Sequence, residues 1–124
     1  METTKETGKK GELLAAEYLR DKGFKIQAVN WQVKHLELDI VAQKDNYLVF
    51  VEVKTRTTSF SENPQDSIDK RKQRHLISAA NSYIFKNRSE LEARFDIVTI
   101  IFKGEQFTIE HIEDAFYPIA RKIF

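Results

Sequence analysis

The chain contains no cysteine, and its 124 residues include only one tryptophan, two prolines and four glycines. Without cysteine it can form neither a disulfide nor a thiolate metal site, which suits a reducing compartment. No apolar run approaches the roughly 20 residues that a membrane-spanning helix needs. The N-terminal segment METTKETGKKGELL also lacks the apolar core of a signal peptide. We therefore expect a cytoplasmic protein without a membrane partner.

A strong charge of either sign is also missing. The net charge is +1, so overall charge does not identify a partner. Hydrophobic residues make up 41% and charged residues 31% of the chain, a balance typical of globular proteins. The length and the absence of repeats or linkers predict a single domain over residues 1–124, in which residues 1–7 form a frayed tail.

Hydrophobic periodicity predicts helices alternating with groups of strands. The first helix is expected over residues 8–22, with Leu13, Ala16 and Leu19 as its apolar stripe, and the second over residues 69–86. The expected strands cover residues 24–33, 36–42, 47–54, 94–102 and 107–112. This order predicts an α/β or α+β fold in which helices flank a central mixed sheet.

Three charged residues stand within the predicted hairpin of strands 36–42 and 47–54. Asp39 lies on the first strand, whereas Glu52 and Lys54 lie on the second and share one face with Leu48 and Phe50. Burying an unpaired charge is costly, so charges on such an apolar strand indicate a functional site. The competing interpretation is a salt-bridge cluster on a sheet face.

These residues suit phosphodiester hydrolysis. Two carboxylates on adjacent strands can hold one hard cation such as Mg²⁺ or Mn²⁺ and leave positions for water and phosphate. A lysine on the same face can orient or deprotonate the attacking water, or offset the charge of the phosphate.

Basic residues gather close to this hairpin in the sequence. They could hold a polyanion over a metal site, although a solvated helix face would have the same composition. The residues are Arg56, Lys70, Arg71, Lys72 and Arg74.

The pattern Asp39, then Glu52-Val53-Lys54, resembles the PD-(D/E)XK signature of restriction-endonuclease-like nucleases. A longer ordered set of segments is similar to the bacterial YraN-like family. This resemblance places the chain near the Holliday-junction resolvases. The segments are residues 11–19, 30–31, 35–42, 49–56, 72–74 and 94–98. Two positions depart from these patterns: Leu36 stands where the family usually has glycine, and Leu38 replaces the proline that precedes the aspartate in the superfamily signature.

The resemblance implies a restriction-endonuclease-like fold and a role for each matching residue. Asp39, Glu52 and the backbone carbonyl of Val53 would bind the metal, and Lys54 would be the catalytic lysine. Glu12 on the first helix and Gln73 on the second would complete the catalytic set. From the residues alone, a surface role for Glu12 and a core-edge amide for Gln73 remain open.

Four further residues receive predictions from their neighbourhood alone. His35, His75 and His111 lack the spacing of metal ligands and are expected at the surface. Asp96 lies within an apolar strand, where we expect it to pair with Arg94 or to cap a loop.

The sequence therefore predicts a metal-dependent endonuclease that cuts DNA, with branched or structured DNA suggested by the resolvase resemblance. The alternatives are a catalytically inactive nucleic-acid-binding module of the same fold and an interaction protein with a structural carboxylate cluster. A homodimer is left open.

Overall fold

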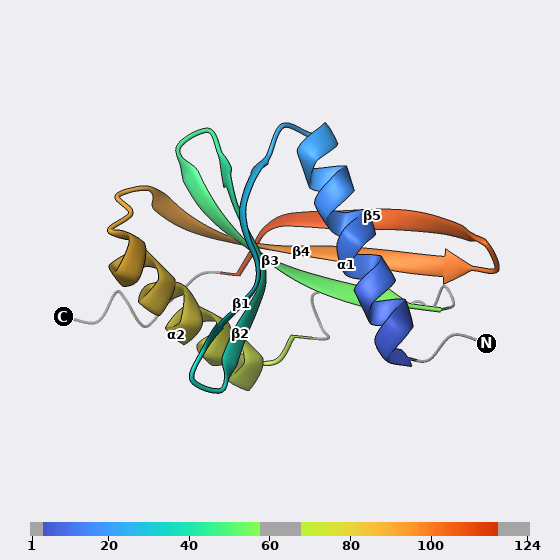
Figure 1. The fold of residues 1–124 in the computed structure, drawn as a ribbon, viewed down its shortest axis with the longest axis horizontal. Coiled ribbons are helices and arrows are strands. Elements are labelled where there is room, and N and C mark those ends of the chain that lie inside the picture. The colour runs from blue at the N-terminus through green and yellow to red at the C-terminus, as the bar shows by residue number, and fades with distance from the viewer. Residues whose placement is uncertain (1–3, 58–67, 117–124) are drawn as a thin grey trace.

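The computed structural model describes residues 4–57 and 68–116. In these residues every expected helix and strand is present, in the expected order (Figure 1). The elements are α1 (Thr4–Asp21), β1 (Lys25–Val33), β2 (Leu36–Lys44), β3 (Tyr47–Arg56), α2 (Lys70–Asn87), β4 (Glu92–Lys103) and β5 (Gln106–Phe116).

The strands form one mixed sheet in the order β1-β2-β3-β4-β5. Neighbouring strands are antiparallel except for β3 and β4, which run parallel. A parallel pair needs a crossover connection, and α2 lies within it. This five-stranded mixed sheet with two flanking helices confirms the predicted fold class and is consistent with a restriction-endonuclease-like fold.

The two helices cover opposite faces of the sheet, because alternate residues of a strand point to opposite sides. Leu48 and Phe50 of β3 belong to the core beneath α2, with Leu76 and Tyr83. The intervening residues of β3 belong to the core beneath α1. That second core includes Ala15, Leu19, Val49, Val51 and Val98.

Helix α1 differs from its prediction in two respects. Leu13 is 70% exposed, and the buried stripe comprises Ala15, Ala16 and Leu19. The helix also begins at Thr4, four residues before the predicted start at residue 8. The exposure of Leu13 has a reason in packing: α1 lies close to β3, since Gly11 is buried where a β-carbon would collide with the Thr55 hydroxyl, and such an approach favours small side chains at the contact.

Helix α2 begins and ends with defined caps. The side chain of Asp69 accepts a hydrogen bond from the backbone N–H of Lys72 at 2.8 Å, as an N-cap does. Arg88, in the left-handed region with φ 52°, closes the other end. Neither α1 nor α2, the helices of the described residues, has the apolar length that crossing a membrane requires.

Candidate active site

Strands β2 and β3 separate at the predicted site. Their register runs from Lys44 opposite Tyr47 to Ile40 opposite Val51, and beyond this point the two strands diverge (Figure 1). Asp39 and Glu52 are the first residues past the last pair. The N–H of Val53 is donated to Asp39 Oδ2 at 2.9 Å. The Asp39 side chain thus takes the place of a backbone partner, and its carboxylate is held at the fork.

The two carboxylates at the fork affect each other's ionisation. Glu52 is only 6% exposed. Burial, and then the negative charge of Asp39, raise the pKa of Glu52 to about 7. Burial also raises the pKa of Asp39, although the hydrogen bond from Val53 and the charge of Lys72 oppose this effect. The pair, of which Glu52 is buried and Asp39 half-buried, therefore shares a position in which a cation would be strongly stabilised.

Two lysines, from different elements, reach Glu52. Lys54 Nζ lies 3.9 Å from Glu52 Oε2, so Lys54 points to the carboxylates as predicted. Lys72 Nζ lies closer to the same oxygen, at 3.5 Å. From the sequence, Lys72 is predicted only as a nucleic-acid contact. Its position at the fork depends on how α2 packs on the sheet, which no local sequence pattern indicates.

Glu12 approaches the fork from α1. With its amide nitrogen facing both acceptors, Asn30 donates to Glu12 Oε1 at 3.2 Å and to Glu37 Oε2 at 2.8 Å. Burial, and then the charge of Asp39, raise the pKa of Glu12. The structure therefore brings Glu12 into the electrostatic environment of Asp39, and Asn30 joins the cluster without having been predicted.

A cleft of about 360 Å³ opens between α1 and the end of β3. It gives Glu12 and Lys54 a common approach from solvent. Its walls are formed by Thr7, Gly8, Glu12, Val53, Lys54, Thr55 and Thr57.

The remaining predicted residues lie around this centre. Gln73 Nε2 donates to the Ile68 carbonyl at 3.1 Å, so its amide braces the start of α2. Arg56 is half-buried at the end of β3, while Lys70, Arg71 and Arg74 are exposed on the first turns of α2. Leu36 packs against the core beneath α2, and Leu38 lies within that core.

The donor set fits a magnesium-type ion only with help from water or substrate. Across residues 4–57 and 68–116, no group of three or more His, Cys, Asp or Glu side chains could hold a metal. The side-chain ligands would be Asp39 and Glu52 alone, with the Val53 carbonyl as the predicted third donor. Mg²⁺ commonly binds through one or two carboxylates, keeps several waters and takes its other ligands from phosphates. The residues present fit that mode of binding.

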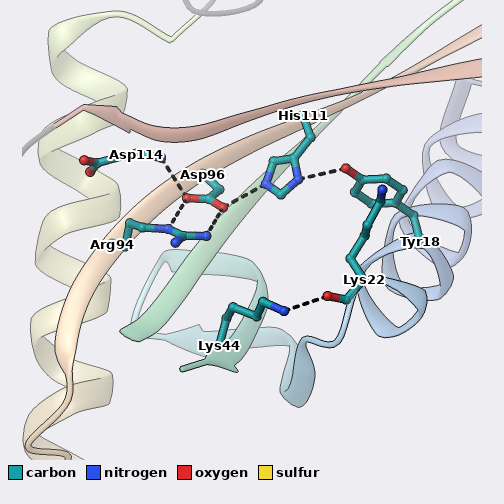
Figure 2. A network of polar contacts seen from close by, with 7 residues as sticks. All are labelled: Tyr18, Lys22, Lys44, Arg94, Asp96, His111 and Asp114. Carbon is teal, nitrogen blue, oxygen red and sulfur yellow. Dashed lines mark hydrogen bonds and ion pairs between the residues drawn. The ribbon is translucent and has the colours of Figure 1, made fainter. Parts of the chain in front are cut away.

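A separate polar network lies beneath α1, centred on Asp96 (Figure 2). Arg94 binds the Asp96 carboxylate through Nε at 2.9 Å and through a terminal nitrogen at 2.8 Å, which confirms the predicted pairing. The Asp114 N–H also donates to it, at 3.0 Å. His111 is not at the surface as expected, because its ring bridges Asp96 at 2.8 Å and the Tyr18 hydroxyl at 3.0 Å.

The raised pKa of Glu52 predicts an unusual pH dependence of stability without metal. Because the folded pKa of about 7 exceeds the ordinary value of 4.5, the folded state binds a proton more tightly than the unfolded state. The free energy of unfolding should thus fall as the pH rises from 4.5 through 7, by up to about 3 kcal/mol.

Urea unfolding at several pH values, in the presence of a chelator, measures this change. Glu52→Gln should flatten the profile, and Glu105→Gln, at the exposed β4–β5 turn, should leave it unaltered. A wild-type stability that is constant or rises over this interval would contradict the raised pKa.

Comparison with known proteins assigns the chain to a family. A protein from Phocaeicola vulgatus, described as a UPF0102 protein, is 47% identical over 113 residues, covering 91% of this chain and 93% of the relative. A UPF0102 protein from Flavobacterium johnsoniae is 49% identical over 116 residues, covering 90% of this chain and 94% of the relative. The model described as "Uncharacterised protein family UPF0102" matches residues 11–100, which include the carboxylate pair, both lysines and Glu12. The YraN-like resemblance is thereby confirmed, and the chain belongs to the uncharacterised protein family UPF0102.

Proposed function

We propose that this protein is a metal-dependent endonuclease of the PD-(D/E)XK type that hydrolyses phosphodiester bonds of DNA. The observation that supports this most directly is the pair of carboxylates at the β2–β3 fork, Glu52 buried and Asp39 half-buried, with the Lys54 ammonium 3.9 Å from that of Glu52. Burial, and then the negative charge of Asp39, raise the pKa of Glu52 to about 7 even though two lysines lie beside it. Such perturbed groups are typical of functional sites.

Each residue at the fork has a defined task in this proposal. Asp39, Glu52 and the Val53 carbonyl hold Mg²⁺ or Mn²⁺, which when bound would polarise the phosphate and make water more acidic. Lys54, beside the cleft, orients the attacking water or offsets charge on the phosphate. Glu12 lies across the cleft with a raised pKa and can accept or return a proton.

The substrate follows from the surroundings of the fork. The first turns of α2 expose Lys70, Arg71 and Arg74, a side-chain set suited to phosphate contacts. DNA is the polyanion that the family resemblance favours, and branched or structured DNA is the particular form suggested by the resolvase resemblance.

Cleavage and binding assays on one substrate panel test this function. The panel comprises duplex, single-stranded and four-way DNA and a structured RNA, each incubated with Mg²⁺, Mn²⁺, Ca²⁺ or chelator. We expect nicking or cutting of at least one DNA form with Mg²⁺ or Mn²⁺, binding without cutting in Ca²⁺, and affinity that falls steeply as salt rises.

The other outcomes separate the competing functions. Binding of several substrates without cleavage at high enzyme concentration would establish a nucleic-acid-binding module instead. Absence of both binding and cleavage would leave the carboxylate pair as a structural feature. Cleavage that persists in chelator would contradict the proposed dependence of the reaction on a metal ion.

A further inference from the structure

Lys72 differs from the other basic residues of α2 because its ammonium faces the carboxylate pair. Its Nζ lies 3.5 Å from Glu52 Oε2, closer than the Nζ of Lys54. The Asp69 cap holds the Lys72 backbone N–H at 2.8 Å and so fixes the point from which the side chain extends. The position of Lys72 is thus built into the start of α2.

The two partners of this ion pair differ in their access to solvent. The Glu52 side chain is 7% exposed, whereas the Lys72 side chain is 45% exposed. Lys72 is therefore the accessible partner of the ion pair, and the Glu52 carboxylate is the buried one. A phosphate can contact Lys72 without first reaching the Glu52 carboxylate.

We propose that Lys72 is an exchangeable counter-ion that couples metal binding to nucleic-acid binding; this inference rests on the proposed function. In the free protein its ammonium neutralises the carboxylates that a divalent ion would occupy. When a phosphate backbone binds, the same ammonium turns to the phosphate and leaves the carboxylates to the metal. Lys72 is thus a positioning residue and not a catalytic one.

Simple electrostatics gives the direction of the coupling. The ammonium and the divalent ion are attracted by the same carboxylates and repel each other. DNA that withdraws the ammonium should strengthen metal binding, and metal should strengthen DNA binding by the same factor, because coupling between two binding sites is reciprocal. The Lys54 side chain is only 22% exposed, so it is less free than Lys72 to turn from Glu52 to a phosphate.

Metal binding to Lys72→Gln provides the test, with no need for cleavage. Mn²⁺ alone is titrated calorimetrically into wild type, K72Q, K72R and K86Q at pH 8.5, where protons compete little with the metal. K86Q makes the same charge change at the exposed far end of α2. We expect K72Q to bind Mn²⁺ about 5- to 10-fold more tightly than wild type, and K72R and K86Q to match wild type.

A second titration measures the coupling itself. Ca²⁺ is titrated in the presence and absence of a saturating short duplex. DNA should tighten Ca²⁺ binding to the wild type, and K72Q should reduce that factor at least about threefold. An equal factor in the two proteins would overturn the proposed coupling.

The remaining outcomes separate this inference from the proposed function. If Mn²⁺ binds through Asp39 but K72Q binds it no more tightly, the inference fails and the metal site stands. If wild type binds no Mn²⁺ even at millimolar concentration, both fail. Should K72Q not fold, the ¹⁵Nζ resonance of Lys72 in the wild type serves instead: a shift at saturating Mg²⁺ supports the exchange, and an unchanged resonance overturns it.

Discussion

Asp39→Asn should reduce DNA cleavage by about 100-fold or more while leaving DNA affinity within about threefold of wild type. The variant keeps an oxygen that can accept the Val53 N–H bond, so the β2–β3 fork retains its local hydrogen bond. It removes the negative charge, and with it one of the two side-chain ligands proposed for the metal. A transition state depends on that charge far more than the initial contacts with phosphates do.

The measurement compares single-turnover cleavage rates and dissociation constants for whichever DNA the wild type cuts. Asp45→Asn is the matched control, because Asp45 lies exposed at the β2–β3 turn and asparagine tolerates its positive φ of 54°. Retention of more than a tenth of the wild-type rate would remove Asp39 from catalysis. A parallel loss of affinity would assign the residue to substrate binding.

A stability measurement on the same variant provides an independent check on the electrostatics. Burial and the neighbouring carboxylate disfavour two negative charges at the fork. Without metal, the neutral asparagine should therefore leave the protein at least as stable as wild type above pH 7. A lower rate in a protein that is no less stable separates a catalytic role from a structural one.

The order of elements and the carboxylate pair could be predicted from sequence because both depend on local patterns. Alternation along residues 36–42 and 47–54 identified the hairpin, and the period of two placed Lys54 with Glu52. The divergence of the strands could not be predicted in this way. At the fork, the Asp39 side chain accepts the Val53 N–H. This contact joins two strands, so the pattern within one strand does not indicate it.

The residues that sequence analysis misplaced are those decided by tertiary packing. Leu13 fits the helical period as well as Ala15 does, but the close approach of α1 to β3 at Gly11 favours small side chains at the contact. His111 lies on a strand that alternates in polarity, and only its neighbours Asp96 and Tyr18 explain its burial. Lys72 belongs to the same class, because the docking of α2 brings it to Glu52.

Asp96→Asn should destabilise the fold by about 3–5 kcal/mol, the largest change in stability that we expect from a single substitution. The Asp96 side chain has no exposed area and accepts hydrogen bonds from Arg94, His111 and the Asp114 backbone. Asparagine removes the charge and replaces one acceptor oxygen with a donor. The Arg94 guanidinium, whose side chain is 12% exposed, would then be left without its counter-ion.

The pH dependence of this contribution has the opposite sign to that of Glu52. Burial alone would raise the pKa of Asp96, but hydrogen bonds from His111, Arg94 and Asp114 together lower it. A folded pKa below the ordinary value of 3.8 means that the stabilisation is present above that value and is lost as the pH falls through the folded pKa. Wild type should therefore lose more stability in acid than D96N does.

Thermal and urea unfolding at neutral pH measure the difference, with Glu110→Gln on the exposed side of β5 as the control for one lost charge. The melting temperature of D96N should fall by roughly 10 °C or more, and that of E110Q should barely change. The hydrogen bonds of the Asp96 side chain go to Arg94, His111 and the Asp114 backbone, none of which is a proposed metal ligand, so folded D96N at low temperature should cut DNA at the wild-type rate. A D96N protein that is as stable as wild type but inactive would instead place the Asp96 network in the active site.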